Sequence, residues 1–183
     1  YEILIPAEFA AHVFDQITGV GDEFGLAHGG YFAINSLRME KGYRHWGHDI
    51  GEENTPFDAG LGFAVAMDKP GGFIGQAALA TQQARGPLTR RLVQLRVAMD
   101  DPPMLYHQEP ILRDGVIVGS ITSGAYGHRL GASLGMGYVS CDAGVTPDWL
   151  TSGKWEVEVA WKRYPAELGL KPWYDPKGDR IRG

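Results

Sequence analysis

Apolar and polar residues follow a helical period in the first half of the chain. In segment 6–18 the apolar residues recur at helical spacing, which predicts an amphipathic helix that ends near Gly19. Two further helices are predicted at 32–41 and 76–85, and each of these is also followed by glycine. Between them, the short apolar run at 62–67 predicts a buried strand.

Beyond residue 87 the period changes to two, which is the period of a strand. Apolar and polar residues alternate at 93–97 and most regularly at 154–162. Segment 109–123 is predicted to be a hairpin, because an Asp-Gly pair at 114–115 supplies the positive φ that a tight turn requires. Short strands between glycine- and proline-bearing loops predict a small antiparallel barrel or sandwich. The pattern therefore predicts an α+β part followed by an all-β part.

Composition restricts the classes of partner. The chain has 183 residues, 44% of them hydrophobic, and a net charge of −5, which suits one large domain or two small ones. Mild acidity with few clustered Lys and Arg argues against a nucleic acid, and no apolar run approaches the roughly 20 residues that span a bilayer. The single cysteine, Cys141, excludes an internal disulfide and fits a reducing compartment. We expect the cytoplasm, or the mitochondrial matrix in a eukaryote.

The stretch GYRHWGHDIGEENTP, residues 42–56, is the densest group of possible metal or acid–base residues. His45 and His48 are three residues apart, whereas zinc-binding histidines on a helix are usually four apart with a distant third ligand. Gly47 interrupts any helix here. We therefore interpret the stretch as a structured joint between elements, and predict no metal site.

The chain carries no motif of a catalytic nucleophile or of a phosphate-binding loop. A lone cysteine such as Cys141 is more often buried than catalytic. Ser123 lies beside glycine but outside any GxSxG motif, and the glycines at 71–75 lack the Lys-Ser/Thr of a P-loop. The carboxylate of Glu2 could accept paired N–H donors from a flat heterocycle such as a pterin or guanine, or it could simply be a surface residue of a strand.

Several motifs, in order, carry a resemblance to a known family. They are YEILIP, SLRMEKGYRHWGHDIGEENTPFDAGLGFAV, KPGGFIGQAAL, EPILRDGVIVGSITSGAYGHRLGASLGMGYV and VEVAWKRYPAEL. The chain resembles the glycine cleavage T-protein (aminomethyltransferase) family over nearly its whole length. Within that family it is most similar to the C-terminal half of dimethylglycine and sarcosine dehydrogenase-type flavoproteins.

The resemblance implies both the fold and its division. Residues 1–86 would be the tail of a T-protein-like α+β folate-binding region, and residues 87–183 a small antiparallel C-terminal β-barrel. The abrupt start and stop of the chain also lead us to expect a fragment of a longer polypeptide.

The resemblance further implies a tetrahydrofolate site. Glu2 would hold the pterin ring, Phe63 would wall it in, and Tyr174 matches a C-terminal tyrosine of the family. The family's catalytic aspartate would lie before residue 1, so we expect no catalytic residue in this chain. T-proteins carry an arginine that faces the folate tail where this chain has Ile34; the tail must then be held differently.

These implications define the expected function. The chain would be the tetrahydrofolate-binding C-terminal fragment of an amine-demethylating oxidoreductase of the dimethylglycine or sarcosine type, capturing a one-carbon unit as methylene-tetrahydrofolate. FAD would belong only to the missing N-terminal half, and the partners would be folate and the rest of the same polypeptide. Alone, the fragment is expected to be inactive. The alternatives are a glycine-cleavage aminomethyltransferase and a non-catalytic structural or docking barrel, while a metal-dependent hydrolase is disfavoured.

Overall fold

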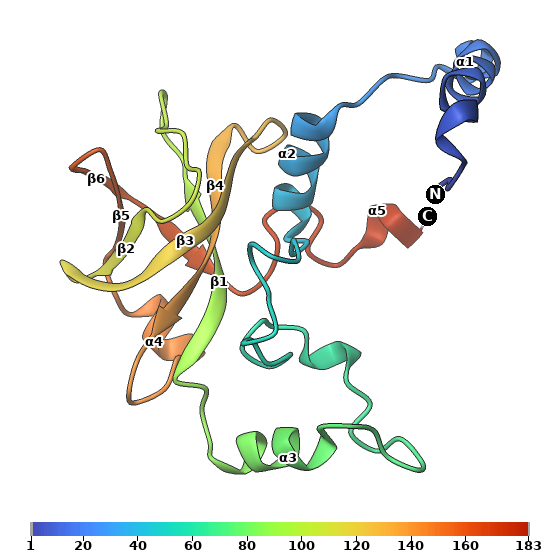
Figure 1. Cartoon of the computed structure of the whole chain (residues 1–183). Coiled ribbons are helices and arrows are strands. Elements are labelled where there is room, and N and C mark those ends of the chain that lie inside the picture. The colour runs from blue at the N-terminus through green and yellow to red at the C-terminus, as the bar shows by residue number, and fades with distance from the viewer. Residues whose placement is uncertain (1, 183) are drawn as a thin grey trace. The chain divides into compact units, whose positions relative to one another are not determined.

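The computed structural model describes residues 2–182, and the chain divides into two compact units (Figure 1). The first unit is Tyr1–Ile34 and the second is Asn35–Gly183. Helix α2, Tyr31–Lys41, begins in the first unit and ends in the second. No helix within the described residues is long and apolar enough to cross a membrane.

The first unit is helical, and most of its apolar side chains are exposed. It holds η1 (Ala7–Phe9), α1 (Ala10–Gly21) and η2 (Asp22–Phe24). The helix predicted at 6–18 is confirmed, but its predicted end at Gly19 is wrong. Helical geometry continues until Gly25, whose φ of 68° turns the chain. Glycine inside a helix costs only about 1 kcal/mol relative to alanine, so it weakens the helix without ending it.

The second unit is built on a seven-stranded antiparallel sheet in the order β6-β5-β2-β3-β4-β1-β7. Its strands are β1 Arg90–Val97, β2 Pro110–Arg113, β3 Val116–Gly127, β4 Ala132–Ser140, β5 Trp155–Val159, β6 Lys162–Pro165 and β7 Glu167–Gly169. The alternate residues Val93, Leu95 and Val97 of β1 point into a buried core that also holds Ile111 and Val157. The predicted fold class, α+β with a C-terminal antiparallel barrel, is confirmed.

Helices of the second unit lie mostly outside this core. They are α3 (Gln76–Ala84), α4 (Pro147–Thr151) and α5 (Asp179–Arg182). Helices α2 and α3 match the predictions for 32–41 and 76–85. The predicted domain boundary at 86/87 falls in the chain between α3 and β1, and it stays a prediction.

The strand predicted at 62–67 is wrong. This segment begins with a single 3₁₀ turn, η3 (Gly62–Ala64), and its Phe63 side chain is 86% exposed. Gly60 has a φ of 67°, and the Leu61 N–H donates to the Pro56 carbonyl at 2.7 Å. Local turns thus satisfy the backbone groups that a strand would pair with a neighbour.

Two tight turns connect strands in the sheet. The predicted turn at Asp114 and Gly115 is confirmed, with φ values of 52° and 83°. The alternation predicted to run through 154–162 instead breaks after Val159. Ala160 and Trp161 have φ values of 48° and 66° and form a second turn, although neither residue favours positive φ. Nothing in the pattern of alternation marks this turn.

Candidate functional site

A cavity of about 720 Å³ lies in the second unit and has Phe63 in its wall. The end of α2, the loop that follows it, the turn at η3 and the C-terminal segment contribute its lining. The lining residues are Lys41, Tyr43, Arg44, Ile50, Leu61, Phe63, Pro172, Asp175, Pro176, Lys177, Gly178 and Arg182. An exposed phenyl ring in such a wall offers a flat apolar surface on which a heterocycle could stack.

The loop after α2 is held in place by Asp49, whose side chain is fully buried. Its carboxylate accepts hydrogen bonds from Arg38 Nη1 at 2.9 Å, from the His45 backbone N–H at 2.8 Å and from Thr122 Oγ1 at 2.6 Å. The Tyr138 hydroxyl donates to the Asp49 carbonyl at 3.0 Å. Residues 42–56, the densest group of possible metal or acid–base residues in the sequence, thus form a joint between α2 and the barrel.

The two histidines of this joint lie against each other. The rings of His45 and His48 are 4.5 Å apart between centroids, with their planes tilted by 32°. Within residues 2–182, no three His, Cys, Asp or Glu side chains come close enough together to hold a metal ion. Gly47, with a φ of 84°, turns the loop so that its N–H donates to the Ile50 carbonyl at 2.8 Å.

Arg44 ties the same loop to the turn that precedes Phe63. Its guanidinium donates to the carbonyls of Gly42 at 2.7 Å, Ala59 at 3.1 Å and Gly60 at 3.4 Å. Burial lowers the pKa of Arg44 by removing water from the charge, and the nearby Asp49 carboxylate partly offsets this. An arginine keeps its proton nonetheless, so Arg44 brings a positive charge to the cavity.

The C-terminal segment contributes another part of the cavity wall, and α2 holds it too. Lys41 Nζ lies 3.0 Å from Asp175 Oδ2 and 2.7 Å from the Asp175 carbonyl oxygen. The Tyr174 N–H donates to the carbonyl of Glu40 at 3.2 Å. The half-buried Tyr174 ring has the guanidinium of Arg129 5.4 Å from its centroid. The hydrogen bond from Lys41 is the largest cause of a lowered pKa at Asp175.

The cavity carries net positive charge. Among the described residues that line it, four are cationic (Lys41, Arg44, Lys177 and Arg182) and one is acidic (Asp175). Opposite charge attracts an anionic ligand, and arginine forms paired hydrogen bonds with a carboxylate. The lining therefore suits a ligand that combines a flat ring with an acidic group.

The three predicted site residues differ in their position relative to the cavity. Phe63 lines the cavity, whereas Tyr174 precedes the lining residue Asp175 in the chain and is not itself among the described residues that line it. Glu2 is exposed and belongs to the other unit. Sequence reasoning missed Arg44, Lys177 and Arg182. Arg44 lies within residues 42–56, between Tyr43 and His45. A single arginine between these residues forms no recognisable binding motif.

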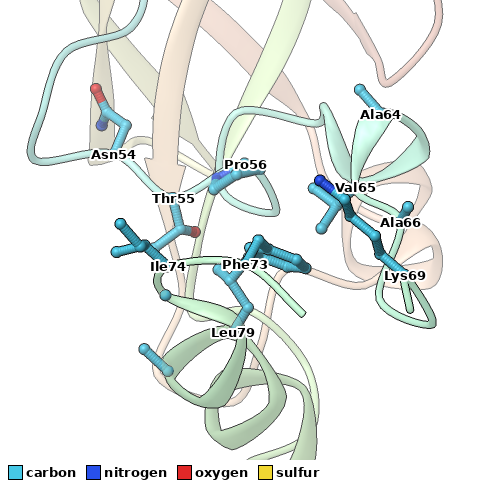
Figure 2. A pocket seen from close by; sticks show the side chains of 12 residues that line it. Asn54, Thr55, Pro56, Ala64, Val65, Ala66, Lys69, Phe73, Ile74 and Leu79 are labelled. Carbon is cyan, nitrogen blue, oxygen red and sulfur yellow. The ribbon is translucent and has the colours of Figure 1, made fainter. Parts of the chain in front are cut away.

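A second cavity, of about 650 Å³, is more apolar (Figure 2). Figure 2 shows Pro56, Val65, Phe73 and Leu79 around it, and Lys69 is the cation in its lining. Binding sites for polar heterocycles normally combine apolar walls with a few converging polar groups. The cavity at Phe63 fits that description better.

Comparison with known proteins gives matches along most of the chain. The GCVT N-terminal domain family matches residues 1–69, and the glycine cleavage T-protein C-terminal barrel domain family matches residues 90–175. The chain is 44% identical over 184 aligned residues to 4-methylaminobutanoate oxidase (formaldehyde-forming) from Paenarthrobacter nicotinovorans, covering 100% of this chain and 21% of the relative. It is 35% identical to human mitochondrial sarcosine dehydrogenase, covering 100% of this chain and 20% of the relative.

A solved structure shares the fold. The glycine cleavage system aminomethyltransferase T from Bartonella henselae matches with a TM-score of 0.76 and 24% identity, covering 94% of this chain and 45% of that chain. The chain thus spans about a fifth of the length of the two curated relatives, at 21% and 20%.

Proposed function

Because the chain belongs to the glycine cleavage T-protein family, we propose that it is the tetrahydrofolate-binding part of a longer amine-demethylating flavoprotein. The observation that carries this proposal is the 86% exposed Phe63 side chain in the wall of a cationic cavity. Folate joins a flat pterin ring to an acidic glutamate tail, and the cavity offers both an aromatic face and positive charge. The residues present therefore fit this cofactor.

Three residues are proposed to contact the folate. Phe63 would stack on the pterin ring, and the Glu2 carboxylate would accept two of its N–H donors in a short, orientation-fixing contact. Tyr174 would support the ring from the C-terminal segment. The cationic lining would favour the acidic tail, which agrees with the presence of Ile34 where the family carries an arginine.

Bound tetrahydrofolate would supply the acceptor for the one-carbon unit that the flavin-bearing part removes from an N-methylamine. The residues of this chain would hold the acceptor in place and exclude water around it. Exclusion of water limits the loss of a reactive carbon unit by hydrolysis. FAD and the catalytic acid would both come from other parts of the longer protein.

A second candidate function differs from the first in what becomes of the one-carbon unit removed from the N-methylamine. One relative is named as a formaldehyde-forming oxidase, so the longer protein could release formaldehyde directly and leave this part without an acceptor role. In that case the barrel would serve only as a structural element. The two candidates differ in whether the cavity at Phe63 binds a folate.

Calorimetric titration of the complete polypeptide with folinic acid tests the proposal. Phe63→Ala is expected to weaken binding about tenfold, because loss of one aromatic stacking partner costs about 1–3 kcal/mol. Glu2→Ala should also weaken it. Trp161→Ala is the matched control, since it removes a 95% exposed aromatic side chain that is not among those lining the cavity, and its affinity should equal that of the wild type.

Two results would count against the proposal. Absence of folinic acid binding to the wild type would favour the formaldehyde-releasing candidate. Equal affinity of the wild type and Phe63→Ala would remove the role given to that ring. If Glu2→Ala binds folinic acid with wild-type affinity while Phe63→Ala does not, the pterin contact is assigned to the wrong carboxylate. The cavity at Phe63 would then still be supported as the folate site.

A further inference from the structure

We infer that Arg38 and Asp49 form a positioning pair that shapes the cavity at Phe63 without touching its ligand. The identity of that ligand rests on the proposed function, whereas the pair itself rests on hydrogen-bond geometry. Neither residue is among the described residues that line the cavity. The loop that they fix does contribute to it, through Tyr43, Arg44 and Ile50.

Arg38 uses all three nitrogens of its guanidinium. Nε donates to Asn35 Oδ1 at 2.7 Å, and Nη2 donates to Ser123 Oγ at 3.0 Å. Nη1 donates both to Asp49 Oδ2 at 2.9 Å and to the Tyr43 carbonyl at 3.2 Å. A lysine at this position has one nitrogen on a flexible stem and could not hold these four acceptors at once. The geometry is specific to arginine.

Asp49 completes the connection to the barrel. Oδ1 accepts a hydrogen bond from the Thr122 hydroxyl of β3. Oδ2 accepts hydrogen bonds from Arg38 Nη1 and from the His45 backbone N–H. The loop after α2 is thereby bound near its start through the Tyr43 carbonyl and further along through Asp49, with β3 as the fixed support. A loop held at both ends presents its side chains to the cavity in one arrangement.

Burial makes the pair sensitive to the loss of either partner. The Asp49 side chain is 0% exposed and that of Arg38 is 14% exposed. Removal of one member of such a pair leaves a buried charge without compensation, and neighbouring groups then move to hydrate it. The groups free to move are those of the loop, since the strands of the barrel are held by their own ladder.

The test measures the loop and the ligand separately. We would prepare Arg38→Lys, Arg38→Met and Asp49→Asn in the complete polypeptide, label tryptophan with 5-fluorotryptophan, and assign the Trp46 resonance with Trp46→Phe. Trp46 lies in the loop and is 67% exposed, so its fluorine signal reports loop conformation. Affinity for folinic acid is measured in parallel, below the melting temperature of every variant. Arg163→Met is the control, because it breaks the Arg163–Glu158 pair of 3.2 Å on β5 and β6.

A shifted or broadened Trp46 signal is expected in all three variants, with folinic acid affinity reduced about tenfold, as for other displacements of groups that support a binding site. Arg163→Met should change neither. A merely stabilising role would lower the melting temperature and leave the Trp46 signal and the affinity of the folded protein unchanged, and that result would overturn the inference. The inference would also be overturned if Arg38→Lys had the Trp46 signal and the folinic acid affinity of the wild type.

The two proposals fail differently. If the wild type does not bind folinic acid, the proposed function is wrong, and the Trp46 signal still decides whether the pair fixes the loop. If the wild type binds and the variants move the Trp46 signal without a change in affinity, the loop is positioned by the pair but does not shape the site, and the inference is wrong.

Discussion

Lys41 and Asp175 are 134 residues apart in the chain, yet Lys41 Nζ lies 3.0 Å from Asp175 Oδ2. The side chains are 15% and 8% exposed, and the same ammonium also reaches the Asp175 carbonyl at 2.7 Å. This contact joins the last turn of α2 to the C-terminal segment, which forms part of the cavity wall. Together with the Tyr174 N–H that donates to the Glu40 carbonyl, it holds that part of the wall in place.

The Asp175 contact should resist acid. The hydrogen bond from Lys41 lowers the pKa of Asp175 in the folded protein, so its stabilisation is complete above the ordinary aspartate pKa of about 3.9. It begins to fade below that value and is lost only as pH falls through the lower folded pKa. A ¹³C NMR titration of the Asp175 carboxyl should show this, and Lys41→Met should move the titration upward. An unchanged titration in Lys41→Met would contradict the assignment.

Tyr138 should make the protein less stable in strong base. Burial raises the pKa of Tyr138 to about 12, above the ordinary value of about 10. Below the ordinary value its stabilisation is complete, and it is lost as pH rises from there through the folded pKa. Between pH values of about 10 and about 12, we expect the free energy of unfolding to decrease less steeply with pH in Tyr138→Phe than in the wild type. Urea unfolding at several pH values measures this. At neutral pH, loss of its bond to the Asp49 carbonyl should cost about 1 kcal/mol.

Gly119 should tolerate no larger residue, whereas Gly19 should. A Cβ atom at Gly119 would meet the backbone carbonyl of Tyr138 on the paired strand β4, which cannot move without breaking the ladder. Gly119→Ala is expected to destabilise the second unit by about 1–3 kcal/mol, the range for overpacked sites. Gly19 in α1 has open space around it, so Gly19→Ala should be neutral or stabilising by up to about 1 kcal/mol. Equal unfolding midpoints for the two variants would contradict this.

Alternation predicted strands of the buried sheet, and helical spacing predicted α1 although most of its apolar side chains are exposed. The alternation at 93–97 became β1, and the Asp-Gly pair at 114–115 formed the expected turn. Besides the end of the first helix, two predictions were wrong because the chain turns where none was expected. Apolar composition at 62–67 suggested burial, but turns at Gly60 and Gly62 expose Phe63. Positive φ at Ala160 and Trp161 depends on the sheet rather than on those residues.

The candidate site was harder to predict than the fold. The resemblance to a family pointed to Phe63, since a motif fixes its position in the chain. Arg44 and Lys177 come together only because α2 holds both a nearby loop and a distant segment. Those long-range contacts depend on tertiary structure, and a spacing of 133 residues leaves no local pattern. The roles of Glu2, Phe63 and Tyr174 in binding folate stay predictions.

The last turn of α2 carries both anchors, Arg38 for the loop and Lys41 for the C-terminal segment. Helix ends unwind more readily than helix centres, and Gly42, with a φ of 64°, terminates this one. Unwinding of that single turn would release both walls together. The cavity is therefore expected to open cooperatively, so that ligand exchange depends on one local equilibrium rather than on two independent movements.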